Sequence, residues 1–129
     1  MDSEHIGIIG LGLVGSALSE RFRAAGFSVC GFDIDSARMN TLEKAGGKCA
    51  DSAAQVALLC KRIVFSLPAT DVVETVVAEL RSRLQPDSIL IDTTTGDPDR
   101  TATLGEALHK DAIHYCDATI SGSSVQVSR

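Results

Sequence analysis

The chain has 129 residues, 44% of them hydrophobic, and a formal net charge of −5. This length allows one domain with its own core, and the acidic balance argues against nucleic-acid or membrane-surface partners. No apolar run approaches the roughly 20 residues of a membrane span, and the polar start M-D-S-E-H differs from a signal peptide.

The predicted strands and helices alternate along the chain. Apolar strand-like runs lie at about 5–10, 28–33, 48–50, 62–67, 88–92 and 113–116. Helix-like runs lie between them, at about 14–25, 36–45, from 52 onward, 70–82 and 98–110. Short strands joined by helices in this order predict an α/β fold, with a doubly wound, mainly parallel sheet and helices on both faces.

Local signals mark where three of the helices begin. The second helix can be capped by Asp35 or Ser36. Ser52 opens a capping box, and Asp97 precedes a proline at the first helical position. We therefore expect helices to start directly after these residues.

The cysteines and histidines show no spacing that is typical of metal ligands. None of the four cysteines belongs to a Cys-x-x-Cys pair, and the three histidines are not spaced as ligands of one ion. We therefore predict no metal site, and buried free thiols in a reducing compartment, which indicates a cytoplasmic protein. The cysteines are Cys30, Cys49, Cys60 and Cys116.

A glycine-rich turn follows the first predicted strand. Residues 6–15 read I-G-I-I-G-L-G-L-V-G, and the second predicted strand ends in Asp33. This combination is the dinucleotide-binding fingerprint of a Rossmann-like fold. Gly10 would allow the tight turn, Gly12 would let a pyrophosphate approach the backbone, and Gly15 would let the helix pack closely. The helix N-terminus would then bind the phosphates through its free N–H groups.

The acidic residue predicts which dinucleotide binds. Asp33 would accept hydrogen bonds from both ribose hydroxyls and repel a 2′-phosphate, so we expect NAD rather than NADP. Asp35 competes for the same role, although Asp33 lies at the expected end of the strand.

Three further loops share the sheet edge with the glycine turn, because ligands gather at the carboxyl ends of parallel strands. These loops read L-P-A-T at 67–70, D-T-T-T-G-D-P at 92–98 and D-A-T-I-S-G-S at 117–123. The Tyr-x-x-x-Lys pair of short-chain dehydrogenases is absent, since Tyr115 is followed four residues later by Thr119.

The motifs G-L-G-x-x-G, S-L-P, I-D-T-T-T-x-D-P and D-A-x-x-S-G, in this order, resemble the β-hydroxyacid dehydrogenases. That family includes 3-hydroxyisobutyrate, tartronate semialdehyde and 6-phosphogluconate dehydrogenases. The resemblance covers nearly the whole chain and implies an oxidoreductase that transfers a hydride between NAD and a small β-hydroxyacid. Residues 1–129 would be its dinucleotide-binding domain.

The resemblance implies roles for individual residues. Leu67 and Pro68 would line the nicotinamide half of the cofactor, and Thr95 would lie near the nicotinamide ribose. Asp33 would bind the other ribose. The pyrophosphate loop would comprise Gly10, Leu11, Gly12, Leu13, Val14 and Gly15. The substrate carboxylate would be held by Ser121, Gly122 and Ser123.

The resemblance also implies a catalytic residue and a second domain that these motifs do not contain. Family members use a general acid/base Lys and an all-helical second domain, and neither fits into 129 residues. We therefore expect a fragment that has no catalytic residue and is inactive alone, from a parent that forms homo-oligomers. Thr119 and Ser123 depart from the family pattern D-A-P-V-S-G-G, which leaves the identity of the hydroxyacid open.

Two alternatives fit part of the pattern. A stand-alone, non-enzymatic Rossmann module that senses nucleotides would share the glycine turn, but it would have no need of the 92–98 and 117–123 loops. An NADP-preferring reductase of the same family would share those loops, but such members usually carry Asn-Arg where this chain has Asp33 and Ile34.

Overall fold

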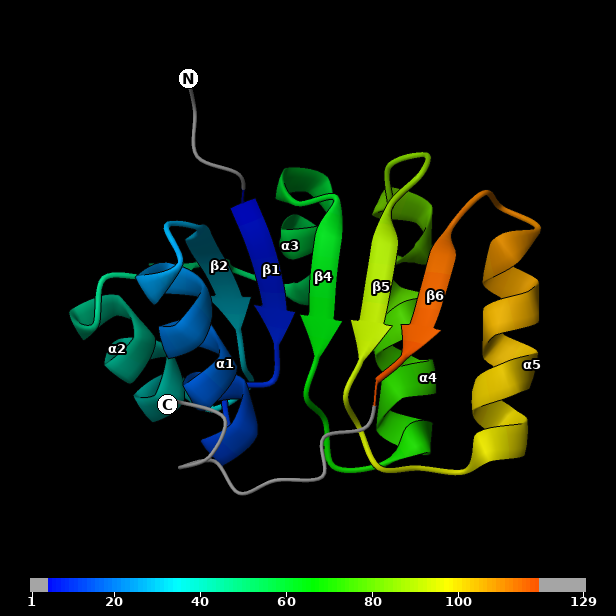
Figure 1. Ribbon diagram of the computed structural model, residues 1–129, viewed down its shortest axis with the longest axis horizontal. Coiled ribbons are helices and arrows are strands. Elements are labelled where there is room, and N and C mark those ends of the chain that lie inside the picture. The colour runs from blue at the N-terminus through cyan, green and yellow to red at the C-terminus, as the bar shows by residue number, and fades with distance from the viewer. Residues whose placement is uncertain (1–4, 119–129) are drawn as a thin grey trace.

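The computed structural model describes residues 5–118, which form one sheet flanked by helices (Figure 1). The strands are β1 His5–Ile9, β2 Ser28–Phe32, β3 Lys48–Cys49, β4 Arg62–Phe65, β5 Ile89–Asp92 and β6 His114–Asp117. The helices are α1 Leu13–Ala24, α2 Ser36–Lys44, α3 Ala53–Leu59, α4 Thr70–Leu80 and α5 Pro98–His109, with a 3₁₀ turn η1 at Arg81–Arg83. All the described strand pairs are parallel, which confirms the predicted α/β class.

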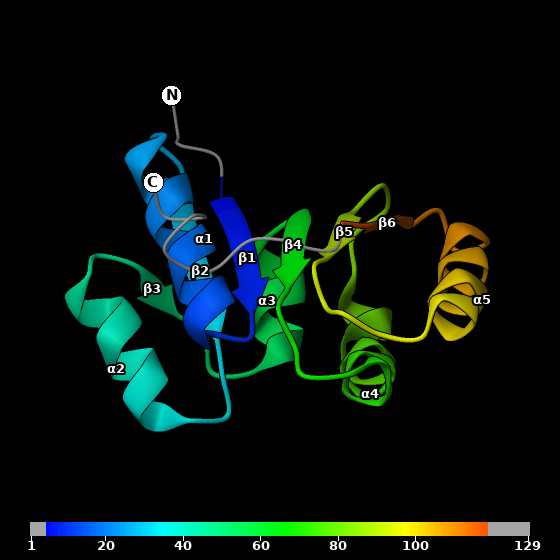
Figure 2. The same ribbon diagram turned by 60° about the horizontal axis from the view of Figure 1, so that its bottom comes forward.

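Helices cover both faces of the sheet, as Figures 1 and 2 show. On one face, Phe22 of α1 and Leu42 of α2 pack with Ile8 of β1. On the other face, α3, α4 and α5 pack around Phe65 of β4 and Leu90 of β5. The inner positions of the central strands are apolar because both faces of the sheet are buried there. The doubly wound arrangement predicted from the sequence is therefore confirmed.

The strand order creates a crevice at one edge of the sheet. The order β3-β2-β1-β4-β5-β6 means that the chain runs outward from β1 in one direction and then from β4 in the other. Open α/β sheets bind ligands outside the carboxyl ends of the strands at such a reversal. These ends lie at the lower edge in Figure 1, between β1 and β4.

The three predicted helix starts are confirmed. Asp35, Ser52 and Asp97 each accept a hydrogen bond from a backbone N–H in the first turn of the following helix. Pro98 occupies the first position of α5, where a missing N–H costs nothing. Asp35, rather than Ser36, is therefore the cap of α2.

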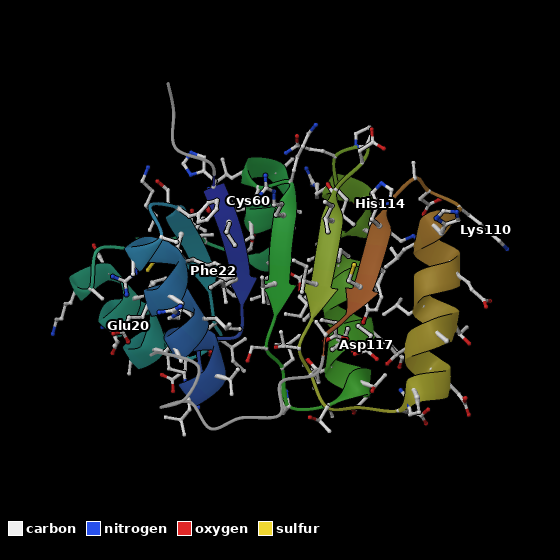
Figure 3. The ribbon with its side chains drawn as sticks, viewed as in Figure 1. Glu20, Phe22, Cys60, Lys110, His114 and Asp117 are labelled. Carbon is white, nitrogen blue, oxygen red and sulfur yellow. The ribbon has the colours of Figure 1, made fainter. Side chains whose placement is uncertain are left out.

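Two of the four thiols are exposed, which corrects the prediction that the cysteines are buried. Cys30 in β2 is buried, as is Cys60 between α3 and β4 (Figure 3). Cys49 and Cys116 are exposed because they belong to β3 and β6, which have a described neighbouring strand on one side only. All four are free thiols.

Residues 5–118 contain no helix that is long and apolar enough to cross a bilayer. Within the same part of the chain, no group of three or more His, Cys, Asp and Glu side chains is arranged to hold a metal ion.

Candidate nucleotide-binding site

Two glycines of the turn after β1 are required by close packing. Gly10 has a φ of 99°, and a Cβ on it would lie 2.0 Å from the carbonyl oxygen of Ser66. A Cβ on Gly15 would lie 2.0 Å from the carbonyl oxygen of Gly10. The predicted tight turn and close helix packing are both present, and the helix packs against the turn itself.

Gly12 differs from Gly10 and Gly15 because a Cβ on it would meet no backbone atom of another described segment at close range. Apart from Leu11 and Leu13, its neighbours along the chain, the described residues place one atom within 4 Å of a Cβ built on Gly12. This atom is a guanidinium nitrogen of Arg38, at 3.9 Å. Gly12 is the N-cap of α1, with no side-chain hydrogen bond to the helix and no acidic residue in the first turn. An approaching phosphate would therefore meet backbone N–H groups and the positive end of the helix dipole.

The side chains between the glycines divide between core and surface. Leu11 is buried and packs into the core beside α1. Val14 is half-buried, whereas Leu13 is exposed at the start of the helix. The side chain of Leu11 thus attaches the turn to the core, whereas that of Leu13 lies on the surface.

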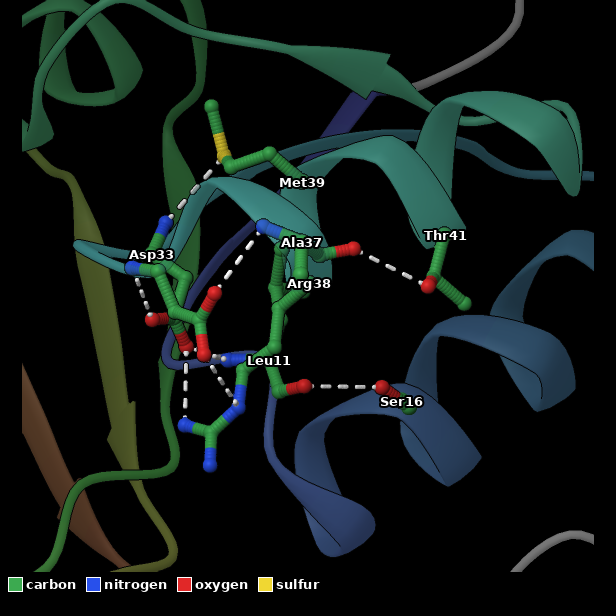
Figure 4. A network of polar contacts seen from close by, with 8 residues as sticks. Leu11, Ser16, Asp33, Ala37, Arg38, Met39 and Thr41 are labelled. Carbon is green, nitrogen blue, oxygen red and sulfur yellow. Dashed lines mark hydrogen bonds and ion pairs between the residues drawn. The ribbon is translucent and has the colours of Figure 1, made fainter.

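Asp33 follows β2 and holds the glycine turn (Figure 4). Its carboxylate accepts hydrogen bonds from the backbone N–H groups of Leu11 at 2.7 Å and Asp35 at 2.8 Å. The side chain is only 6% exposed. Charge-assisted hydrogen bonds of this kind are strong and fix the carboxylate in one orientation.

Arg38 of α2 is a site residue that the sequence analysis did not identify. Its guanidinium lies 3.5 Å from the Asp33 carboxylate and 3.8 Å from that of Asp35 (Figure 4). The Arg38 side chain is 52% exposed, so these ion pairs contribute little to stability and the side chain can turn away. Its position in the first turn of α2 is visible in the sequence, but the direction of its side chain is not.

A cleft of about 280 Å³ at the reversal between β1 and β4 brings four of the predicted residues together, and the rest of the glycine turn lies outside its lining. Gly10 and Asp33 lie on one side of it, and Leu67 and Pro68 lie on the other. The remaining lining side chains are mostly apolar, with Arg38 and Glu79 as charged exceptions. Apolar walls with a few fixed polar groups are typical of cofactor sites.

Residues 5–129 match the family model of the NAD binding domain of 6-phosphogluconate dehydrogenase. The chain belongs to this family. It is 28% identical over 120 residues to the mitochondrial 3-hydroxyisobutyrate dehydrogenase of Mus musculus, covering 91% of this chain and 36% of the mouse enzyme. The family resemblance read from the four motifs is therefore confirmed.

Solved structures share the fold of this domain. A Mycobacterium tuberculosis 3-hydroxyisobutyrate dehydrogenase with L-serine superimposes with a TM-score of 0.93 at 21% identity, covering 98% of this chain and 44% of that enzyme. An imine reductase variant from Myxococcus stipitatus in complex with NAD+ gives a TM-score of 0.89 at 24% identity, covering 97% and 43%. At these identities the likeness shows the fold, and the chain spans less than half of either protein.

The loop after β5 meets the cleft of the NAD-binding domain through Thr94. Thr94 is buried, and its Oγ1 accepts a hydrogen bond from the backbone N–H of Leu67 at 3.1 Å. Thr93 donates its hydroxyl to the carbonyl oxygen of Phe65 at 2.7 Å. Thr95, the residue predicted to lie near the nicotinamide ribose, is exposed and does not line the described cleft. Its role stays a prediction.

A buried carboxylate lies directly behind this loop. Asp92 is 3% exposed and accepts hydrogen bonds from the backbone N–H of Thr94 and from the phenol of Tyr115. Burial, together with the hydrogen bond to Asp92, raises the pKa of Tyr115 and keeps the phenol protonated. No local pattern in the sequence indicates this pair, because its two members are 23 positions apart.

The predicted substrate-binding residues Ser121, Gly122 and Ser123 lie outside the described residues.

Proposed function

We propose that this domain binds NAD in the cleft between β1 and β4, as the cofactor platform of a dehydrogenase that oxidises a small β-hydroxyacid. The arrangement of Gly12 and Asp33 carries the proposal. Gly12 leaves space in front of an uncapped helix N-terminus, and Asp33 lies beside it as a fixed carboxylate. These two features fit a pyrophosphate and an adjacent ribose, respectively.

Each part of the cleft would contact a different part of the dinucleotide. Backbone N–H groups at the start of α1 would bind the pyrophosphate, and Asp33 would accept the ribose hydroxyls. Leu67 and Pro68 would contact the nicotinamide half from the β4 side. NAD itself supplies the hydride acceptor, and the protein supplies its orientation.

The charge at Asp33 favours NAD over NADP. A 2′-phosphate would approach a carboxylate that two backbone donors hold in place, so the repulsion could not be relieved by moving Asp33. Arg38, 3.5 Å from Asp33, offsets part of this repulsion. The imine reductase of Myxococcus stipitatus is also known in complex with NADP+, at a TM-score of 0.88, so this fold accommodates either cofactor.

Titration calorimetry on the 129-residue chain with NAD and with NADP tests the assignment. We expect NAD to bind and NADP to bind at least about tenfold more weakly, which corresponds to about 1.4 kcal/mol. Replacing Arg38 with Gln should widen this gap, because it removes the positive charge nearest to Asp33. Tighter binding of NADP, or no binding of either dinucleotide, would contradict the proposal.

The activity belongs to the longer parent protein in this proposal. Residues 1–129 alone should bind NAD without oxidising a hydroxyacid, because the resemblance assigns proton transfer to a Lys outside them. Production of NADH by this chain alone from 3-hydroxyisobutyrate would contradict that statement. The homo-oligomeric parent and the cytoplasmic location stay predictions.

A further inference from the structure

A line of hydrogen bonds runs from β6 to the cleft across three neighbouring strands. The Tyr115 phenol in β6 donates to Oδ2 of Asp92, the last residue of β5. Oδ1 of Asp92 accepts the N–H of Thr94 at 2.9 Å. Oγ1 of Thr94 accepts the N–H of Leu67, which lines the cleft, at 3.1 Å. Each of these bonds joins a different pair of residues, and the last one lies where the cofactor would bind.

Asp92 depends on Tyr115 because it is buried. The register pairs Asp92 with Phe65 on one side and with Asp117 on the other, at the carboxyl end of the sheet (Figure 3). A carboxylate at 3% exposure is costly unless donors satisfy its oxygens, and the phenol satisfies Oδ2. Loss of the phenol would leave Oδ2 without this donor. The Asp92 side chain would then rotate toward another hydrogen-bond donor.

The Tyr115 ring is fixed independently of its hydroxyl. A Cβ on Gly105 of α5 would lie 3.5 Å from the Tyr115 ring, an ordinary van der Waals distance. The ring also packs against the core cluster that contains Leu108 and Ile113. The hydroxyl can therefore be removed while the ring stays in place, which separates its hydrogen bond from its packing.

Thr94 holds the loop after β4 at the amide of Leu67. The N–H of Ser66 donates to Ile9 in the sheet, at 2.9 Å. Leu67 comes next and donates to Thr94, and the following residue, Pro68, has no N–H to donate. The Leu67–Thr94 bond is thus the one that fixes the wall of the cleft. The same two loops are joined further out by the N–H of Asp97, which donates to Oγ1 of Thr70 at 2.8 Å.

We propose that Tyr115 is a positioning residue for the nicotinamide half of the cofactor. It holds Asp92, Asp92 holds the loop at Thr94, and Thr94 holds Leu67 at the wall of the cleft. The proposal rests on the proposed function, which places the nicotinamide half of NAD against Leu67 and Pro68. The adenine half, which Asp33 and the glycine turn would bind, should not depend on Tyr115.

Calorimetry with NAD and with ADP, on the 129-residue chain and its Tyr115→Phe variant, separates the two halves of the cleft. The variant should bind NAD about three- to tenfold more weakly, the range expected for one hydrogen bond. Its affinity for ADP, which lacks the nicotinamide, should change less than twofold. Thr94→Val should show the same pattern, and the double variant should bind NAD no more weakly than Thr94→Val alone, because both changes interrupt one line of bonds.

Ser88→Ala is the matched control. Ser88 is buried at the other end of β5, and its hydroxyl donates to the carbonyl oxygen of Gln85 at 2.7 Å. This variant also loses one buried hydroxyl, but it should bind NAD and ADP as the unmodified chain does. Equal losses for NAD and ADP in Tyr115→Phe, or no loss for either, would overturn the proposal.

Amide hydrogen exchange in the ligand-free chain tests the same line of bonds without any cofactor. The Leu67 amide should exchange faster in Tyr115→Phe, whereas the Leu11 amide, which donates to Asp33, should be unaffected. If the unmodified chain bound neither nucleotide, the proposed function would be wrong. The exchange rate of the Leu67 amide would still show whether Tyr115 positions this loop. Unchanged exchange at Leu67 would overturn the positioning role.

Discussion

Replacement of Gly15 by Ala should destabilise the domain, although Ala is the better helix former. The added Cβ would lie 2.0 Å from the backbone carbonyl oxygen of Gly10, and its position is fixed by the backbone because it is bonded directly to Cα. No rotamer change can relieve this overlap, so α1 must move away from the turn. Overpacking of this kind costs about 1–3 kcal/mol or more, and helix propensity returns at most about 1 kcal/mol. We expect a net loss of about 2 kcal/mol in the free energy of unfolding, or about 6–10 °C in Tm.

Two other glycines provide matched controls for this prediction. Gly105→Ala in α5 places its Cβ 3.5 Å from the Tyr115 ring, so only the propensity gain should remain and Tm should rise. Gly12→Ala places its Cβ in open space and should leave the free energy of unfolding within about 1 kcal/mol. The same change should abolish NAD binding, because the pyrophosphate would occupy that space. Urea and thermal unfolding of the three variants measure these effects, and a Gly15→Ala variant as stable as Gly105→Ala would refute the packing argument.

Two further predictions concern buried charge and thiol exposure. Asp33→Asn should lower the free energy of unfolding by about 1–3 kcal/mol in urea titrations, because an amide nitrogen cannot accept one of the two backbone N–H bonds. Asp35→Asn should cost almost nothing since Asn is an equally good N-cap, and equal losses in both variants would contradict this reasoning. In a short iodoacetamide pulse near neutral pH, Cys116 should be alkylated faster than Cys49. Desolvation of the thiol and the nearby Glu43 raise the pKa of Cys49, although its side chain is exposed. Faster labelling of Cys49 in peptide maps would count against that explanation.

The order of elements and the helix starts could be predicted because their signals are local. The caps at Asp35, Ser52 and Asp97 act within one helical turn, and the glycine turn lies directly after an apolar strand. Alternation of strands and helices then left few possible topologies. The predicted helix at 70–82 is instead α4 followed by a 3₁₀ turn, since helix ends have the weakest sequence signals.

The contacts between loops could not be predicted because they depend on strand register. Thr94 reaches Leu67 only because β4 and β5 pair with Phe65 opposite Asp92. A run of three threonines gives no indication of which hydroxyl points toward the neighbouring loop. Tyr115 is similar, because its phenol reaches Asp92 through the β5–β6 pairing.

The same carboxylate of Asp33 serves the fold and the proposed recognition of ribose. A carboxylate offers about four acceptor positions, and the N–H groups of Leu11 and Asp35 each use one of them. About two positions therefore remain, which equals the number of ribose hydroxyls, but the Arg38 guanidinium approaches one of the same oxygens. Binding of the ribose at Asp33, as proposed, would require Arg38 to turn away from Oδ2, and the 52% exposure of Arg38 means that this movement would cost little. The backbone donors stay in place, so the glycine turn does not have to rearrange when the cofactor binds.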